Sequence, residues 1–517
     1  MKFPFLFLLT ALFATAEKPP PLLPSQVAVV YNTEVPASRE LAEFYALNRR
    51  IPAENLIGLS VTEKATISRA TYNKFIRGPL RKEFAARNFW TLAKDDKGIT
   101  QPVETRIRCL VTLKGIPLRI SRAEEPETPD GQKRQFNKVN EASVDSELSL
   151  LGVSPYPIGG TIPNPYFRQN VPVAKSPAKF LLLVGRLDAS SYDHCKRMVL
   201  DALDVEKDGL WGRAYLDLSL KKGGFAIGEE WIDNIAKLTL GNSHPTIIDR
   251  NTNTLPTNYP MKDAALYFGW YTTHRNGPFL NPEMKFKKGA VAVHIHSFSA
   301  QQLLNPAKNW SAALIDRGAA ATLGNTWEPY LQASHHLDIF YDRLVRGYSL
   351  VEAAYMSINV LSWQNVVLGD PLYTPYRITE VTAEMLQGDR DYKIIRYAAA
   401  RFPDPEERFN QLVKAAAKTK NGSVYEMIGY GFLEAGEIEK ARKGFAEARK
   451  LFTDPADRLR QDLNLAELER REKNTEAALA ILRKAKATYP DIPERKAIDG
   501  LLVILDPPAP PATQRKK

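Results

Sequence analysis

Up to about residue 377, short apolar runs alternate with segments in which apolar positions recur every three or four residues. The first such pair is the run QVAVVYN at 26–32 and the amphipathic segment at 38–50, for which Ser38 is a candidate N-cap. Most apolar runs have no polar alternation, which is typical of strands covered on both faces. Strands that alternate with helices predict a doubly wound α/β fold with a mostly parallel sheet. Further strands are expected at 55–60, 106–115, 179–187, 264–271, 290–297 and 319–325.

The expected α/β domain covers 26–377, because two prolines in VVLGDPLYTPYR stop the regular pattern at its end. A polar stretch rich in proline and glycine interrupts it at 121–177, and we interpret this stretch as a surface excursion over one end of the sheet. The strands at 264–268 and 290–296 are expected to be neighbours. Sites in such folds gather at the carboxyl ends of the strands.

After about residue 385 the apolar spacing is helical throughout, and two copies of a tetratricopeptide-like pattern follow one another at an offset of 37 residues, from Ala441 to Ala478. Small residues at these positions let paired helices approach closely. We therefore predict a helical module over 385–503 that contacts a protein or peptide partner; a generic amphipathic bundle is the alternative. The tail at 504–517 is expected to be disordered. The matching residues are Ile428, Gly429, Phe432, Gly436, Ala441, Phe445 and Ala448, then Leu465, Ala466, Ala478, Leu482, Ala485 and Pro490.

The amino terminus has the three parts of a secretory signal peptide: Lys2, an apolar run at 3–13, and the small-x-small sequence that ends at Ala16. We expect cleavage after Ala16, a proline-rich linker at 17–25, and export to the periplasm or the extracellular space. No later segment reaches the roughly 18 apolar residues of a spanning helix, so the mature chain is expected to lack a transmembrane segment.

The charge and the cysteines narrow the class of protein. The net charge is +11, but the basic residues are dispersed and form no stripe interleaved with aromatics, so nucleic acid is not an expected partner. The two cysteines are Cys109, in a strand pattern, and Cys195, in a helix pattern. A chain of this size with two cysteines is not a disulfide scaffold, and both a pair and two buried thiols remain open.

Several segments within 26–377, among them CLVTLKGIPLRI, GLWGRAYLD, HIHSFSA and LGDPLYTPY, resemble an uncharacterised family of bacterial secreted proteins. The order of elements in 260–376 is also similar to gingipain-type cysteine peptidases, which have the caspase-like fold. In that family one strand ends in Gly-His, the next ends in Ser-Cys, and Gly-Asp-Pro closes the domain. The corresponding segments here are LYFGWY, HIHSFSA and VLGDP, with GAAATLGN between the last two.

That resemblance implies a caspase-like fold without its catalytic dyad. Trp270 stands where the family has its histidine, and Phe298 stands where it has its cysteine. Neither side chain can accept a proton or attack a carbonyl group. Cysteine-peptidase activity is therefore not expected.

The histidines suggest a metal site as another possibility for chemistry. His294 and His296 alternate along one strand, so their side chains should point to the same face, and such a pair can hold zinc when a further ligand completes the set. A hydrogen-bonded core histidine beside a crevice residue explains the same pattern, and no complete ligand motif such as H-E-x-x-H is present. Candidates for the further ligand are Asp188, Glu328, His335, His336 and Asp338.

A serine hydrolase is a further alternative. Ser297 or Ser299 would be the nucleophile, and the base would be one of the nearby histidines. The sequence lacks the G-x-S-x-G elbow, and Ser299 is also placed to cap the following helix. The candidate bases are His274, His296 and His335.

Polar and aromatic residues at the ends of several strands are expected to line one crevice, suited to a peptide or a sugar. Within this set, a structural ion pair with a helix cap also explains Arg186 and Asp188, and Asp370 is expected to fix a turn. The sequence thus predicts a secreted binding protein on a caspase-like domain without the dyad. A divergent hydrolase that uses the histidine-rich crevice, with or without a metal, is the alternative. The expected crevice residues are Asn32, Lys114, Arg186, Asp188, Trp270, Tyr271 and Glu328.

Overall fold

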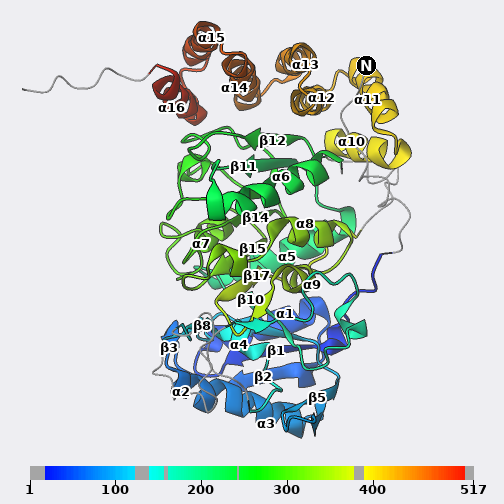
Figure 1. Cartoon of the computed structure of the whole chain (residues 1–517), viewed down its shortest axis with the longest axis vertical. Helices are drawn as coiled ribbons and strands as arrows, with labels where there is room; N and C mark the ends of the chain where they lie inside the picture. Colours follow the sequence, from blue (N-terminus) through cyan, green and yellow to red (C-terminus); the bar gives the residue numbers. More distant parts are fainter. Residues whose placement is uncertain (1–17, 123–138, 156–160, 242–243, 378–388, 507–517) are drawn as a thin grey trace, which may run out of the picture.

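The structure is a computed structural model, and it describes residues 18–122, 139–155, 161–241, 244–377 and 389–506. A ten-stranded sheet is followed by an all-helical region (Figure 1). The predicted α/β class, the mostly parallel sheet and the helical region after it are confirmed. The expected signal peptide at 1–16 and nearly all of the expected tail lie outside the described residues. No helix within the described ranges is long and apolar enough to cross a membrane.

The central sheet has the strand order β12-β11-β13-β14-β15-β17-β10-β6-β1-β2, with β17 antiparallel to β15. Its strands are β1 (Val27–Asn32), β2 (Leu56–Leu59), β6 (Cys109–Leu113), β10 (Leu183–Leu187), β11 (Arg213–Asp217), β12 (Thr246–Asp249), β13 (Ala264–Gly269), β14 (Val291–His294), β15 (Ala321–Asn325) and β17 (Asn365–Gly369). Smaller sheets contain β3 (Thr66–Ile67), β7 (Arg119–Ile120) and β8 (Ala142–Ser143); β4 (Trp90–Lys94) and β5 (Thr100–Thr105); and β9 (Ile162–Pro163) and β16 (Val360–Leu361).

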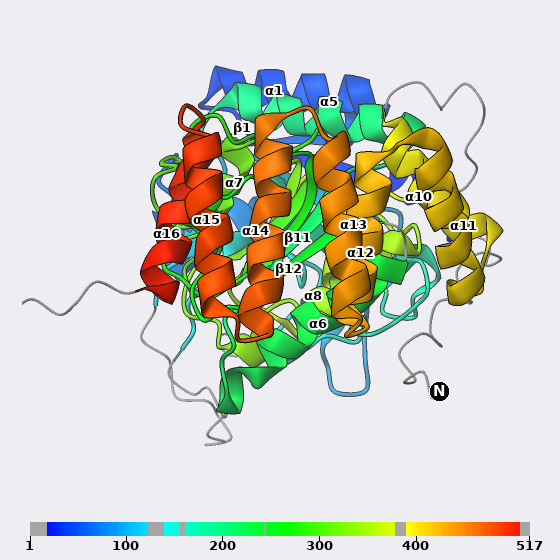
Figure 2. The same cartoon turned by 90° about the horizontal axis from the view of Figure 1, so that it is seen from above.

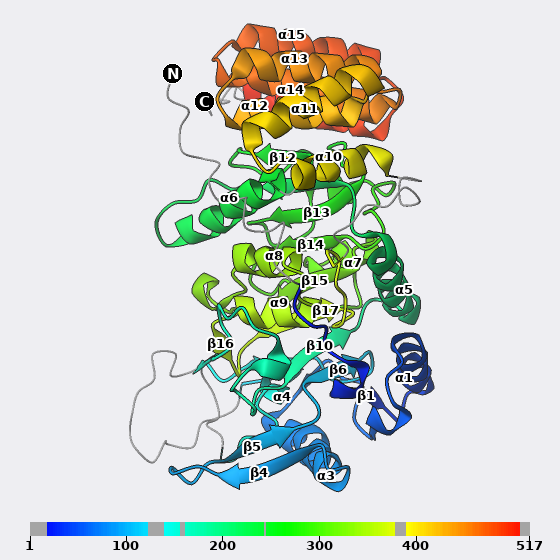
Figure 3. The same cartoon turned by 90° about the vertical axis from the view of Figure 1, so that its right-hand side faces the viewer.

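Helices cover both faces of the sheet, and Figure 3 shows α1 and α5 on one side and α6, α8 and α9 on the other. The helices of the α/β domain are α1 (Pro36–Arg49), α2 (Arg69–Tyr72), α3 (Gly78–Ala86), α4 (Val144–Leu148), α5 (Tyr192–Asp208), α6 (Ala226–Gly241), α7 (Ser311–Asp316), α8 (Leu337–Val345) and α9 (Leu350–Ser357). The helical region contains α10 (Arg390–Arg401), α11 (Pro405–Thr419), α12 (Gly422–Glu434), α13 (Ile438–Leu451), α14 (Pro455–Arg471), α15 (Thr475–Thr488) and α16 (Lys496–Leu505).

Strand β1 shows why the apolar runs lack polar alternation. Val27 and Val29 belong to the apolar cluster that includes α1, whereas Ala28 and Val30 belong to the cluster that includes α3. All four side chains are fully buried. A strand covered on both faces places apolar residues at every position.

The predicted neighbours β13 and β14 are confirmed. They pair in parallel register, with Leu266 opposite Val291 and Gly269 opposite His294. Strand β15 pairs in parallel with β14 on the other side. The carboxyl ends of β13, β14 and β15 therefore meet at one edge of the sheet.

Two local expectations are wrong. Ser38 is not the N-cap of α1, because the helix begins at Pro36 with Val35 as its N-cap. Ser38 is buried, and its Oγ accepts a hydrogen bond from the backbone N–H of Asn32 (3.1 Å) and donates one to the carbonyl of Lys114 (2.7 Å). It thus joins the ends of β1 and β6.

The segment 121–177 is also more than a surface excursion. Every residue of α4 is buried, and the helix packs against β10 and β17. Its Asp145 forms an ion pair with Arg186 of β10 at 2.7 Å. The polar composition of the segment suggested exposure to solvent. Polar residues of α4 such as Asp145 are instead buried and form ion pairs.

The helical region packs against the β12 edge of the sheet (Figures 1 and 2). Helices α12, α14 and α16 lie next to the sheet, and α13 and α15 form the outer layer. Leu459 and Leu463 of α14 share one apolar cluster with Ile247 of β12. At the centre of this interface, Glu426 of α12 contacts Arg213 of β11 at 2.8 Å and Arg460 of α14 at 2.6 Å, and all three are at most 1% exposed.

The predicted close approach within the helix pairs is confirmed. Ala441 and Ala478 are fully buried. A Cβ on Gly429 would lie 2.6 Å from the ring of Phe445, which leaves no room for a side chain between α12 and α13. The assignment to the tetratricopeptide class stays a prediction.

Candidate functional site

A group of partly exposed aromatic and charged side chains lies where β13, β14 and β15 end. We call it the aromatic patch and define it as Lys221, Phe225, Tyr271, His296 and Glu328. The ring of Tyr271 lies 5.4 Å from that of Phe225 and 5.3 Å from that of His296. The ammonium group of Lys221 lies over Tyr271, 5.4 Å from the ring centroid. Tyr271 is 37% exposed and Phe225 is 43% exposed, so the rings are open to a ligand.

Sequence reasoning missed Lys221 and Phe225. Both lie in the KKGGF segment between β11 and α6, which has no strand or helix pattern. The signal that could have found them is the position of this segment after a strand of the sheet, where sites gather.

Trp270 forms the floor of the patch rather than part of its surface. It is fully buried, and a Cβ on Gly228 of α6 would lie 2.6 Å from its ring. Gly228 therefore makes room for the indole. Trp270 is also 5.5 Å from Tyr271 and 6.3 Å from Phe225, so it supports both exposed rings.

The turn after β14 has no catalytic group at the position that the resemblance gives to a nucleophile. Phe298 stands there in the left-handed region, with φ of 59°. Its backbone N–H donates to the carbonyl of Trp327 at 2.9 Å, so it is not available to stabilise an oxyanion. That Trp270 takes the place of the base, so that the dyad is missing, stays a prediction of the resemblance.

His294 is a hydrogen-bonded core residue. Its Nε2 accepts from the backbone N–H of Thr272 at 3.3 Å, and its Nδ1 lies 2.9 Å from the hydroxyl of Tyr267. The imidazole stacks on Trp310 at 3.6 Å and is 1% exposed. Burial, together with the nearby His296, holds its pKa well below the ordinary value. Both ring nitrogens are occupied in a neutral side chain.

His296 is partly buried and belongs to the patch. Its Nδ1 lies 2.5 Å from the carbonyl of Ser297, and since a carbonyl only accepts, Nδ1 carries the proton. Nε2 is then an acceptor in the neutral side chain. Burial lowers the pKa of His296, which favours that neutral form.

In the part of the chain that the structure describes, neither the hydroxyl of Ser297 nor that of Ser299 is hydrogen-bonded to a candidate base. Ser299 is 1% exposed, and its Oγ accepts from the backbone N–H of Asn325 at 3.0 Å. It does not cap a helix as expected, because α7 begins only at Ser311. The Nδ1 of His274 accepts from the backbone N–H of Asn309 at 3.3 Å, and Ser297 contacts His296 through its carbonyl.

The expected metal ligands are not assembled in the structure. His335 lies just before α8 and contacts α9, where its Nδ1 is 3.1 Å from both the carbonyl of Ala354 and the Oγ of Ser357. His336 stacks on Trp231 at 4.5 Å, and Asp338 accepts from Asn234. Within the described part of the chain, no three His, Cys, Asp or Glu side chains come together as metal ligands.

The expected crevice residues fall into two groups instead of one. Asn32, Lys114, Arg186 and Asp188 lie on β1, β6 and β10 or directly after them, whereas the other three lie at β13 and β15. In the strand order, β15 lies two positions from β10 and β13 lies four, which places them about 10 and 19 Å from β10.

The residues of the first group form ion pairs and hydrogen bonds within the fold, which explains their presence without a ligand. All five N–H groups of Arg186 are used, by Asp145, by Asp188 and by the carbonyls of Ile116 and Pro117. Lys114 Nζ lies 3.5 Å from Asp188. The side chain of Asn32 donates to the carbonyls of Val61 and Gly115, and Asp370 fixes its turn by accepting from the backbone N–H of Leu372.

Both cysteines are free and buried, which settles the alternative that the sequence left open. Burial raises the pKa of the Cys109 thiol and of the Cys195 thiol. Neither is a reactive thiolate at neutral pH.

Comparisons with known proteins assign no family to the chain. No family model matches it, and no curated protein matches it. A solved structure described as "Structure of Protease" aligns with a TM-score of 0.36 and 12% identity, over 68% of this chain and 79% of that chain.

Proposed function

We propose that the protein is an exported, non-catalytic binding protein that takes a peptide on the aromatic patch. The observation that carries the proposal is the turn after β14: Phe298 and Trp270 provide no nucleophile and no base, yet exposed rings surround this turn. Export rests on the signal peptide that the sequence predicts.

The chemistry of the patch favours a peptide over a sugar. Aromatic side chains such as Tyr271 and Phe225 supply large apolar contact area at binding sites. A sugar would stack on a free ring face, but Lys221 covers one face of Tyr271. The planes of Phe225 and Tyr271 are inclined by 60°, so the rings form walls rather than a flat platform.

The charged members of the patch give a peptide its orientation. Lys221 and Glu328 carry opposite charges, and both side chains are exposed. The Nε2 of His296 can accept a hydrogen bond from a backbone N–H of the ligand. A peptide with an apolar residue between an acidic and a basic residue matches this arrangement.

We propose a second binding surface, for a protein partner, on the helical region. Because α12 and α14 are packed against the sheet, a protein partner of this region would contact the outer helices α13 and α15. The hydrolase alternative has less support, since Ser299 Oγ, His274 Nδ1 and His335 Nδ1 each already have a hydrogen-bond partner.

Selection of random peptides displayed on phage against the full chain tests the proposal. We expect enriched peptides that bind the wild type and lose binding to the Tyr271→Ala variant. Tyr397→Ala is the matched control, because Tyr397 is an exposed tyrosine of α10, outside the patch. Equal loss in both variants, no enrichment at all, or binding only to a glycan array would each overturn the proposal.

A further inference from the structure

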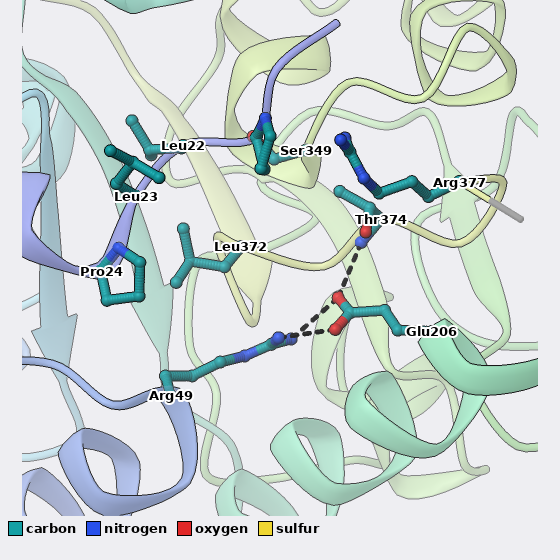
Figure 4. Close-up of a pocket in the computed structure, with 10 residues that line it drawn as sticks. Leu22, Leu23, Pro24, Arg49, Glu206, Ser349, Leu372, Thr374 and Arg377 are labelled. Carbon is teal, nitrogen blue, oxygen red and sulfur yellow. Dashed lines mark hydrogen bonds and ion pairs between the residues drawn. The ribbon is translucent and has the colours of Figure 1, made fainter. Parts of the chain in front are cut away.

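A cavity of about 510 Å³ lies near the amino end of β1, away from the aromatic patch (Figure 4). Its volume is in the range of small-molecule sites. Figure 4 shows Leu22, Leu23 and Pro24 along one side and Glu206, Thr374 and Arg377 along the other. One side comes from the segment before β1, and the other comes from α5 and the segment after β17, so the site exists only in the folded domain.

One wall of this cavity is apolar, and the charged groups on its floor are paired with one another. Leu22, Leu23 and Leu372 supply apolar surface. On the floor, Arg49 forms two hydrogen bonds to Glu206, at 2.6 and 3.0 Å, and a third to Asp370. Glu206 also accepts from the backbone N–H of Thr374 at 2.9 Å. The floor carboxylates therefore already have their partners.

Arg377 on the opposite wall is different, because its hydrogen bond goes to a neutral group. Its Nη1 donates to the carbonyl of Pro19 at 2.9 Å. The buried Glu352 is the nearby carboxylate, but it accepts from the backbone N–H of Val173 at 3.0 Å and from the Oγ of Ser349 at 2.8 Å. In the part of the chain that the structure describes, no carboxylate forms an ion pair with Arg377.

Two further cations gather beside Arg377 and are likewise bound to neutral groups. Lys18 Nζ donates to the carbonyl of Val345 at 3.0 Å. The guanidinium of Arg396 lies 3.8 Å from the ring centroid of Trp211 and 5.4 Å from that of Tyr376. Burial, and the charges of Arg396 and Arg377, lower the pKa of Lys18 to about 8. Like charges gathered in this way favour binding of an anion.

We propose that this cavity binds a small amphipathic anion, a carboxylate on an apolar body. The carboxylate contacts Arg377, whose planar fork matches its two oxygens. The apolar body packs against Leu22, Leu23 and Leu372. A free carboxylic acid and the carboxyl terminus of a peptide share this chemistry. The proposal is independent of the aromatic patch.

Calorimetric titration of the full chain with two probes tests this site. Octanoate stands for a free acid and N-acetyl-leucine for a peptide terminus, while N-acetyl-leucinamide and inorganic phosphate are the controls. We expect saturable binding of at least one carboxylate and much weaker binding of both controls. The carboxylate that binds more tightly identifies the source.

The variants Arg377→Gln and Arg39→Gln complete the test. We expect the first to weaken carboxylate binding about tenfold or more, and the second, on the exposed face of α1, to leave it unchanged. Binding of the amide as tightly as the acid, binding of phosphate as tightly as the carboxylates, or no effect of Arg377→Gln would overturn the proposal. The comparison of acid with amide uses the wild type, so it decides the matter even if Arg377→Gln fails to fold.

Discussion

Asp217 and Asp249 stand opposite each other in register on β11 and β12, and both are buried. Two adjacent buried carboxyl groups cannot both be ionised without a large electrostatic cost. Burial and Asp249 raise the pKa of Asp217 well above its usual value, and burial raises that of Asp249 to about 7. The pair therefore keeps a proton at neutral pH.

This pair is connected to the core of the candidate site. Because the Nε2 of His294 accepts from Thr272, its Nδ1 carries the proton and donates to the hydroxyl of Tyr267. Tyr267 in turn donates to Asp217 at 3.3 Å. The backbone N–H of Thr272 thus fixes the direction of both hydrogen bonds of His294.

Replacing Asp249 with asparagine should change how stability depends on pH. The folded-state pKa of about 7 exceeds the ordinary 3.8, so the folded state binds more protons than the unfolded state between about pH 4 and 7. The free energy of unfolding of the wild type should gain a contribution from Asp249 at acidic pH and lose it as the pH rises through 7.

Thermal melts of wild type and Asp249→Asn between about pH 4.5 and 8 measure this effect. Because Asp249 raises the pKa of Asp217, the difference reports the titration of this pair. The other charges that face Asp249 are Glu467, Arg470 and Arg471 on α14, and they are the same in both proteins. We expect the variant to gain stability relative to wild type as the pH rises. A difference that is constant across the range would contradict the raised pKa.

Glu426→Gln should destabilise the contact between the helical region and the sheet. Burial alone would raise the pKa of Glu426, but the charges of Arg213 and Arg460 lower it to about 2. Loss of this carboxylate leaves two buried guanidinium groups with only the partly exposed Asp457 as a shared partner, at a cost of about 3–5 kcal/mol. Urea denaturation measures the loss. The control is Glu437→Gln in an exposed ion pair with Lys440, expected to cost about 0–1 kcal/mol.

Because the folded-state pKa of Glu426 is depressed, its stabilisation is complete above the usual 4.5 and is lost as the pH falls towards 2. Acid melts of the wild type should show this loss, and those of Glu426→Gln should not. Equal acid sensitivity in both proteins would argue against the buried ion pair.

Ala441→Leu should overpack the contact between α12 and α13. The alanine has no exposed surface, so a larger side chain forces its neighbours apart at a cost of about 1–3 kcal/mol. Ala480→Leu is the matched control, because Ala480 lies on the exposed face of α15. Unfolding curves that are the same for both variants would count against this packing.

The two thiols should not react while the protein is folded. Cys109 and Cys195 are buried and free, so iodoacetamide should add nothing to the native chain and two groups to the unfolded chain, as read by intact mass. Alkylation should not change peptide binding. A native adduct on either cysteine would refute the burial described here.

The sequence predicted most strands of the central sheet, including β10 with its buried Arg186, and it missed β11 and β12. Strands β11 and β12 end in Asp217 and Asp249, and β11 begins with Arg213. Arg213 has its partner on the helical region and Asp217 has one on β13, whereas Asp249 accepts from Asn251 in the loop after β12. Such tertiary partners leave no periodic signal, so the runs did not stand out as strands.

Only part of the candidate site was predicted, because contacts between distant segments leave no signal in the local sequence pattern. Trp270, Tyr271 and His296 follow apolar strands and were found from that position. The single crevice with Asn32 and Arg186 did not form, because the order of strands within a sheet is not encoded in the local pattern. The H-x-H spacing could not tell a core histidine from a ligand, since Trp310 and Tyr267, which surround His294, come from other elements.

The helices packed over β12 also determine at which edge this sheet can pair with another strand. An edge strand offers unpaired backbone groups to any other strand, and at β12 the helices α12 and α14 exclude such an approach. At the other edge, the guanidinium of Arg87 donates to the carbonyl of Leu56 in β2. The helical region thus protects this edge from self-association, and a chain that ended before α10 would expose the β12 edge of the sheet to pairing with its own copies.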